Sequence, residues 1–170
     1  MTTDLVKYLL RFFILILAQV LIVQHINLTT YVVLFPYILV IILLPFQTPK
    51  LVLLFTAFAV GCTIDFFYDS SGLHASACTL MAFARYYILK YMSPREGYDA
   101  ILNPTVDDMG LQWFITFAGS LVLIHHFFFF YLEVFRFSEF FATLLRALLS
   151  SIGTFLFIYL IQFLFFTKRK

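Results

Sequence analysis

The sequence predicts an all-α integral membrane protein, a compact bundle of about six transmembrane helices in one domain over residues 1–170. Of these 170 residues, 63% are hydrophobic and only 12% are charged, whereas soluble domains carry roughly 45–50% apolar and about 25% charged residues. The mean hydropathy is +0.99, and the 24 phenylalanines often occur in runs that suit a lipid-facing surface. A water-soluble globular protein, a disordered chain and a disulfide-stabilised scaffold are therefore excluded.

Charge and cysteine content narrow the function classes. The net charge of +2 is too small to indicate nucleic-acid binding, and the basic residues do not cluster on a soluble segment. Cys62 and Cys78 both lie in apolar stretches and match no metal-binding spacing. We interpret them as small packing residues. The sequence therefore predicts no cofactor, no metal ion and no nucleic-acid partner.

Polar and charged residues divide the chain into spans, each needing about 20 residues at a rise of 1.5 Å. No charged residue occurs from Phe12 to Pro49, and the polar run from Gln24 to Thr30 splits this stretch into two helices. No small-x-small cleavage site follows the first helix, so we expect it to be retained rather than removed as a signal peptide. The predicted spans are residues 8–26, 31–46, 51–68, 74–91, 111–133 and 139–166.

Two of these spans have special features. The second is short, contains Pro36 and ends at Pro45, which predicts a kinked helix. The sixth is long, so we expect it to tilt.

Before the fifth span lies a water-adapted loop, residues 93–110, in which Asp107 or Asp108 is expected to cap the next helix. This loop is the best candidate for a cytoplasmic contact, through Arg95, Glu96, Asp107 and Asp108.

Lysine and arginine residues predict the orientation. With the N-terminus inside and six spans, the outer loops carry only Arg136, and every inner loop is basic. Five spans would place the two basic termini on opposite faces, which the same rule disfavours. We therefore expect both termini in the cytoplasm. The inner side then carries Lys7, Arg11, Lys50, Lys90, Arg95, Lys168, Arg169 and Lys170.

Ionisable residues inside the spans are informative because each costs roughly 2.5–3.5 kcal/mol at the middle of a span. With this orientation, five spans place polar groups in the outer half of the bundle, where we expect them to meet in the interior. Asp65 with Arg146 is the leading ion pair, buffered by histidine. Three readings stay open: a proton or ligand site, a structural pair, or Arg146 extending outward to water. The predicted cluster comprises Gln19, Asp65, His74, His125, His126 and Arg146.

Spacing refines these expectations. His125 and His126 are adjacent and so about 100° apart on a helix, which does not favour one shared metal ion. Arg85 lies in the cytoplasmic half of its span, where we expect it to extend to the interface. Small-xxx-small spacings, such as Ser150 with Thr154, predict close helix packing.

Catalytic motifs are not found in the sequence: it contains no nucleophile elbow, phosphate-binding glycine loop or zinc-protease motif. Asp107 and Asp108 are adjacent, but they lie in the inner loop. Asp69 follows Asp65 by four residues, but it is expected at the lipid–water boundary. The sequence therefore predicts that the protein is not an enzyme. An intramembrane enzyme would need a second carboxylate or a histidine within hydrogen-bond reach of Asp65.

One stretch resembles the MreD family of rod shape-determining membrane proteins. It reads GCTIDFF at residues 61–67 and SGLHASA at residues 71–77. Family members often have G-x-x-x-D at the end of one helix, and one subgroup opens the next with G-x-H-A. The likeness covers nearly the whole chain. Further agreement comes from Gln19 and Asn27, from Pro36 and Pro45, from the loop SPREGY at residues 93–98, and from His125 with His126.

The resemblance implies a fold similar to the substrate-binding subunit of vitamin transporters. It carries the aspartate and histidine of the family's hairpin over to Asp65 and His74. It also implies a non-enzymatic, multi-pass scaffold of the bacterial inner membrane that regulates cell shape and sidewall peptidoglycan synthesis. The expected partner is MreC, a single-span periplasmic protein, and through it the MreB filament and the peptidoglycan polymerase and transpeptidase.

Two expectations concern what such a chain binds. We expect the partner to dock through helices or on the Phe-rich outer face near residues 127–137. The alternative function is the substrate-binding membrane subunit of a small-molecule transporter, with the polar outer cluster as its pocket. A pocket of roughly 300 Å³ or more, open to the outer side, would favour that alternative.

Overall fold

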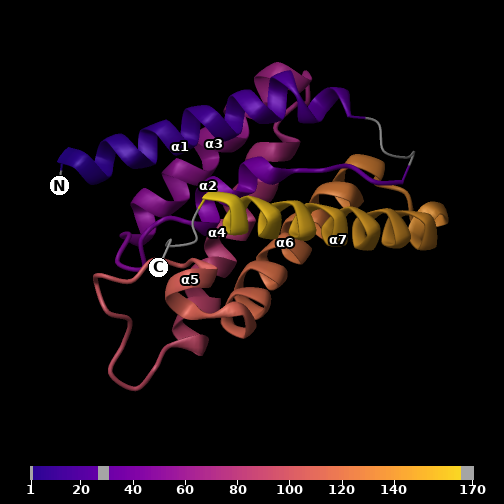
Figure 1. Ribbon diagram of the computed structural model, residues 1–170. Helices are drawn as coiled ribbons and strands as arrows, with labels where there is room; N and C mark the ends of the chain where they lie inside the picture. The colour runs from indigo at the N-terminus through magenta and orange to yellow at the C-terminus, as the bar shows by residue number, and fades with distance from the viewer. Residues whose placement is uncertain (1, 27–30, 166–170) are drawn as a thin grey trace.

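A computed structural model describes residues 2–26 and 31–165 of the chain (Figure 1). These residues form helices and no β-strand, which confirms the all-α prediction for this part of the chain. The ranges predicted at 51–68, 74–91, 111–133 and 139–166 coincide with helices to within one residue at each end. The first helix begins and ends earlier than expected. The long helices are α1 (Thr2–Leu21), α3 (Lys50–Tyr68), α4 (Leu73–Met92), α6 (Leu111–Val134) and α7 (Phe140–Phe165).

The helix surfaces are consistent with a membrane environment. Helices α3, α6 and α7 are each long and apolar enough to cross a membrane. Large apolar side chains cover the outside of the long helices, for example Phe55 and Phe66 on α3 and Phe141 on α7. Water would solvate such a surface poorly, whereas lipid tails are as apolar as the side chains themselves.

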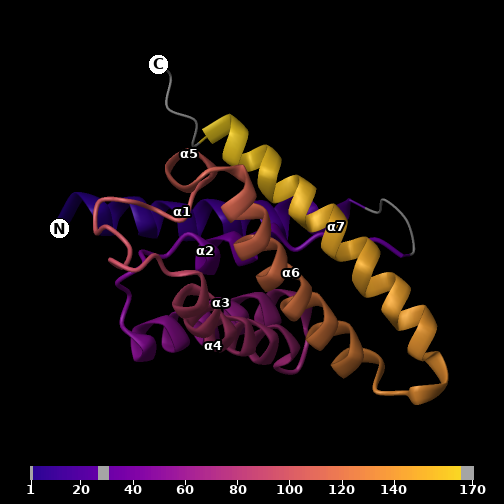
Figure 2. The same ribbon diagram turned by 90° about the horizontal axis from the view of Figure 1, so that it is seen from below.

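The helices pack as neighbours in chain order. Helix α3 packs against α4, α4 against α6, and α6 against α7. The start of α1, the end of α7 and the loop between α4 and α6 lie toward one end of the molecule, whereas the turn between α6 and α7 lies toward the other (Figures 1 and 2). A short 3-10 helix, η1 (Val23–His25), follows α1, and η3 (Phe137–Glu139) precedes α7.

The segment 31–46 is not the single kinked helix that the sequence predicts. Residues 31–35 lie outside any helix, and only η2 (Pro36–Ile38) and the one-turn helix α2 (Leu39–Ile42) follow. Proline explains the difference. Pro36 lacks an N–H and disfavours the α region for Phe35, so helix can begin only at Pro36 itself, and Pro45 ends the segment soon after.

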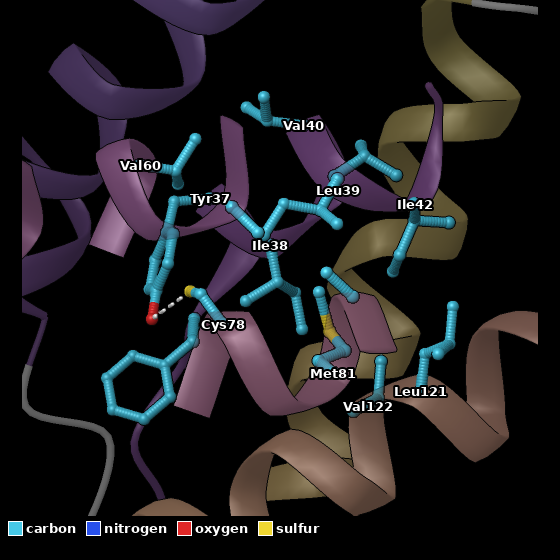
Figure 3. Close-up of a cluster of buried hydrophobic side chains, with 14 of the residues drawn as sticks. Tyr37, Ile38, Leu39, Val40, Ile42, Val60, Cys78, Met81, Leu121 and Val122 are labelled. Atoms are coloured by element: carbon cyan, nitrogen blue, oxygen red, sulfur yellow. Dashed lines mark hydrogen bonds between the residues drawn. The ribbon is translucent and has the colours of Figure 1, made fainter. Parts of the chain in front are cut away.

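This unusual segment forms the centre of the bundle. It runs between α1 and α7 (Figure 1), and residues 34–43 are all buried. Figure 3 shows side chains of η2 and α2 packed against three long helices. The long helices therefore pack around a mostly non-helical piece of the same chain. The labelled contacts are Tyr37, Ile38, Leu39, Val40 and Ile42 with Val60 of α3, Cys78 and Met81 of α4, and Leu121 and Val122 of α6.

Candidate functional site

The tyrosine of the central segment joins two of the predicted histidines. The hydroxyl of Tyr37 lies 2.8 Å from Nδ1 of His74 and 3.0 Å from Nε2 of His125. The sulfur of Cys78 lies 3.7 Å from the same hydroxyl, and all four side chains are buried. A hydroxyl donates one hydrogen bond and accepts others, so one imidazole accepts from Tyr37 and the other donates to it. We call Tyr37, His74, Cys78 and His125 the polar centre.

A phenylalanine ring brings the three histidines together. The ring centroid of Phe35 lies 5.1 Å from that of His74, 5.8 Å from that of His125 and 5.3 Å from that of His126. The first two contacts are edge-to-face, an arrangement that pairs of aromatic rings prefer. The predicted meeting of these histidines in the bundle interior is therefore what the structure shows, but around a residue that sequence reasoning did not single out.

Two hydroxyls of α7 hold the backbone of the extended segment. The N–H of Val33 donates to Oγ of Ser150 at 3.0 Å, and the N–H of Phe35 donates to Oγ1 of Thr154 at 3.1 Å. Alternate residues of an extended chain are about 6.6 Å apart, and residues four apart on a helix about 6 Å, so the two spacings match. The Ser-x-x-x-Thr spacing thus satisfies buried N–H groups that have no helical partner.

Gly153 allows this close approach. A Cβ built at Gly153 would lie 3.0 Å from Cδ2 of Leu34 and 3.2 Å from Cγ1 of Val32. Both contacts are tighter than ordinary van der Waals distance. The small residues of α7 therefore serve the extended segment, whereas the sequence predicted only contacts between helices.

Gln19 and His126 complete the network around the segment. Gln19 is fully buried, and its Nε2 donates to the carbonyl of Leu34 at 3.2 Å and to the hydroxyl of Tyr68 at 2.6 Å. His126 Nδ1 lies 2.9 Å from the carbonyl of Val122, and its Nε2 lies 3.0 Å from Oγ1 of Thr154. A neutral imidazole that donates through Nδ1 accepts through Nε2, so it takes the hydroxyl proton of Thr154.

The predicted ion pair between Asp65 and Arg146 is wrong. Asp65 accepts hydrogen bonds from the N–H of His74 at 3.0 Å, the N–H of Ala75 at 2.8 Å and the hydroxyl of Ser70 at 2.7 Å. The N-cap residue of α4 is a glycine with no side chain to fill this role. The carboxylate of α3 therefore caps the start of α4, where unpaired N–H groups and the helix dipole favour a negative charge.

Arg146 pairs within the hairpin of α6 and α7 instead. Its Nη1 lies 3.0 Å from Oε2 of Glu133, with side chains 31% and 35% exposed, respectively. The guanidinium carbon lies 4.6 Å from the centroid of the Phe130 ring. The sequence analysis chose Asp65 as the partner of Arg146 from the predicted depth of both residues, and the partner is Glu133. Partly exposed pairs of this kind contribute only about 0–1 kcal/mol.

Asp65→Asn tests the capping role. The amide keeps one acceptor oxygen and loses the other, so one N–H at the start of α4 is left unpaired. We expect the free energy of unfolding to fall by about 1–3 kcal/mol, measured by thermal unfolding in detergent. Asp69→Asn is the matched control, because Asp69 is exposed and left-handed with φ of 52°, a conformation that asparagine tolerates. Equal stability of the two variants would contradict the capping role.

Tyr37→Phe tests the polar centre. Removing the hydroxyl leaves Nδ1 of His74 and Nε2 of His125 without their shared partner inside the bundle. We expect a loss of about 1–3 kcal/mol in unfolding free energy, since a buried unsatisfied polar group carries its full desolvation cost. Tyr91→Phe, at an exposed tyrosine of α4, should leave the unfolding midpoint unchanged. A wild-type midpoint for Tyr37→Phe would show that the hydroxyl does not hold the two histidines.

The loop 93–110 contains the other predicted site residues. Arg95, Glu96 and Asp107 are exposed. The short helix α5 (Val106–Met109) lies in this loop and is capped by Thr105, whose hydroxyl accepts from the N–H of Asp108 at 3.2 Å. The expectation that Asp107 or Asp108 caps the next helix is therefore wrong, because the N-cap of α6 is a glycine with no side-chain cap. The Asp108 carboxylate accepts from the N–H of Asn103 at 3.0 Å.

An aromatic contact anchors this loop to the bundle. The ring of Tyr98 stacks on Phe46 at a centroid distance of 4.2 Å, and the ring of Trp113 meets Phe46 edge-on at 5.7 Å. Burial raises the pKa of the Tyr98 hydroxyl above its ordinary value of 10. The stacked tyrosine thus remains neutral at physiological pH, and the exposed Arg95 and Glu96 lie two to three residues before this anchor.

Arg85 does not extend to the interface as the sequence predicted. Its side chain is buried, and it donates to the carbonyl of Leu44, just beyond the end of α2. The guanidinium carbon lies 5.7 Å from the centroid of the Phe117 ring. The residue therefore satisfies another backbone group of the central segment, as Ser150, Thr154 and Gln19 do at its other end.

Three hollows of the described surface lie away from the polar centre. One lies between α1 and α7, one on the outer face of α3 and α4, and one at the turn between α6 and α7. None of the residues lining these three belongs to the polar centre. Among the described residues, no group of three His, Cys, Asp or Glu side chains could hold a metal ion. Comparison of the chain with protein families, curated proteins and solved structures finds no match.

Proposed function

We propose that this chain is a non-enzymatic scaffold of the bacterial inner membrane that binds an MreC-like single-span protein. In that role it regulates cell shape and sidewall peptidoglycan synthesis as part of the cell-elongation complex. The MreB-like filament and the polymerase and transpeptidase pair connect to it through this partner. The resemblance of residues 61–77 to the MreD family supports the proposal, together with the arrangement of the polar centre.

The observation that carries this proposal is that the chain's own segment fills its interior. The hydroxyl of Tyr37, the hydroxyl of Thr154 and the amide of Gln19 are all engaged with groups of the same chain. A transport or catalytic site needs polar groups that converge on an open pocket. Here these three groups bond to backbone and side chains of the same chain, which favours a scaffold over a small-molecule-binding transporter subunit.

The motif behind the resemblance has a structural role that suits a scaffold. Gly61 and Asp65 lie one turn apart on α3, and both face the start of α4. The glycine allows the two backbones to touch, and the aspartate caps the second helix. These residues fix the shape of the α3–α4 hairpin and therefore the outer face that it presents.

We expect the partner's transmembrane helix to contact that outer face. A broad hollow of about 620 Å³ lies there, and its lining residues include Cys62, Ser76, Thr79, Phe58 and Phe83. Small residues let helix backbones approach closely in lipid, where association depends on packing. A helix about 10 Å wide has a cross-section of about 80 Å², so the hollow accommodates one to two helical turns. The Phe-rich face suits this role less well, because Phe129 and Phe130 point into the bundle.

Co-purification from cells expressing both proteins tests the proposal. Wild-type protein should retain a tagged MreC-like protein, and Thr79→Trp should reduce the retained amount at least about tenfold by filling the hollow. Ala142→Trp is the matched control, because Ala142 is exposed on α7. No retention by folded wild-type protein would overturn the scaffold role. Equal retention by Thr79→Trp and Ala142→Trp would overturn the assigned face.

A further inference from the structure

We propose that a groove between α1 and α7 holds one acyl chain of an anionic phospholipid, with the lipid phosphate at Arg11. The groove has a volume of about 360 Å³. Ala18 of α1 and Ile161 and Phe165 of α7 line its sides, and Pro36 and Leu39 of the central segment also line it. This binding site is independent of the partner interaction proposed above, since the two lie on different helices.

The groove exists because the central segment separates two helices. In Figure 1 the segment runs between α1 and α7, and η2 and α2 occupy the space where helix-to-helix contact would otherwise form. Every side chain that lines the groove is apolar except Arg11. Within a bilayer such a groove fills with hydrocarbon, because nothing in its walls can hydrogen-bond water.

The size of the groove selects an acyl chain over a protein helix. Arg11 and Ile22 line it and are eleven residues apart on one helical stretch, so it extends for roughly 16 Å. Its mean cross-section is then about 22 Å² over that length. A methylene chain keeps about 4 Å from its neighbours and needs about 16 Å², whereas a helix needs about 80 Å². A partner helix or a second copy of this chain would therefore cover the groove without entering it.

The charge of the groove selects the headgroup. Arg11, in the first half of α1, is the one charged residue of the lining, and it marks the end of the groove that points toward the start of α1. A guanidinium carries five donors in a planar fork that matches phosphate, so it can hold a phosphate in addition to a partner on the chain. The basic residues predict this end to be cytoplasmic, where anionic lipids attract arginine by about 1 kcal/mol per residue.

Native mass spectrometry of the purified protein tests the proposal. Protein reconstituted in vesicles of equal parts phosphatidylglycerol and phosphatidylethanolamine is extracted in mild detergent and weighed. Wild-type protein should carry one phospholipid, with phosphatidylglycerol favoured about fivefold. Ala18→Trp and Ile161→Trp fill the groove from opposite walls and should each abolish the adduct. Arg11→Gln should keep the adduct and lose the preference.

Ala59→Trp is the matched control, since Ala59 is an exposed alanine of α3, and it should behave like wild type. Absence of a discrete lipid adduct on wild-type protein would overturn the proposal. An unchanged adduct on both tryptophan variants would also overturn it. So would tryptophan variants that lose a co-purifying protein and keep the lipid, because the groove would then bind that protein. Co-purification of the MreC-like protein, measured on the same samples, separates this result from the scaffold role, because Ala18→Trp should leave that interaction intact.

Discussion

Gly61→Ala is expected to lower the unfolding midpoint sharply, because a Cβ at this position would overlap the backbone of α4. It would lie 2.6 Å from the carbonyl oxygen of His74, and closer still to the backbone N and Cα of Ala75. Backbone atoms cannot rotate away as a side chain does, so α3 and α4 would have to separate. Overpacking of a core typically costs 1–3 kcal/mol, and we expect about 3 kcal/mol or more here. Thermal unfolding in detergent measures the loss.

The control for this change is another glycine within a long apolar helix. Nothing lies within 4 Å of a Cβ built at Gly119 of α6. Gly119→Ala should therefore be neutral or stabilise the protein by up to about 1 kcal/mol, the usual gain in helix propensity. If Gly61→Ala were as stable as Gly119→Ala, the close approach of α3 and α4 would be wrong.

The double variant Ser150→Ala with Thr154→Val is expected to release the extended segment. It removes the acceptors of the N–H groups of Val33 and Phe35 and the donor to Nε2 of His126. Each buried N–H left unpaired costs about 1–3 kcal/mol, so we expect a loss of about 2–6 kcal/mol for the pair. Thermal unfolding measures the loss, and faster amide hydrogen exchange at Val33 and Phe35 would locate it.

Ser151→Ala is the control for the double variant. Ser151 is also buried on α7, but its hydroxyl donates to the carbonyl of Ala147 in its own helix at 2.7 Å. Losing that bond leaves a carbonyl that its helix already engages, so stability should change little. A double variant as stable as Ser151→Ala would mean that the hydroxyls of α7 do not hold the segment.

The long helices could be predicted from the sequence because few charged residues interrupt the apolar stretches. Lys50, the polar turn after Tyr68 and the loop after Met92 mark helix ends to within one residue. The same reasoning failed for residues 31–46, which are as apolar as a helical span. Length and hydropathy cannot distinguish a helix from a buried extended segment, and the conformation depends on Pro36 together with acceptors on distant helices.

The site was predicted in part. The predicted depth of each residue in its span correctly placed Gln19, His74, His125 and His126 in one buried region. It failed for Asp65 and Arg146, because depth says nothing about which way a side chain points around its helix. Tyr37, Phe35 and the role of Thr154 were missed. Their importance follows from a non-helical backbone that needs hydrogen-bond partners, although a proline in an apolar stretch and a Ser-x-x-x-Thr face together were a usable signal.

The central claim is that an extended piece of the chain fills the bundle interior and occupies its polar side chains. Solid-state NMR of the labelled protein in lipid bilayers tests this claim directly, through the Cα and Cβ chemical shifts of Val32, Val33, Leu34 and Phe35. The account predicts non-helical shifts at these four residues and helical shifts at residues 39–42. Helical shifts at all four would contradict it, because a helix there would pair its own N–H groups and leave Ser150 and Thr154 without their backbone partners.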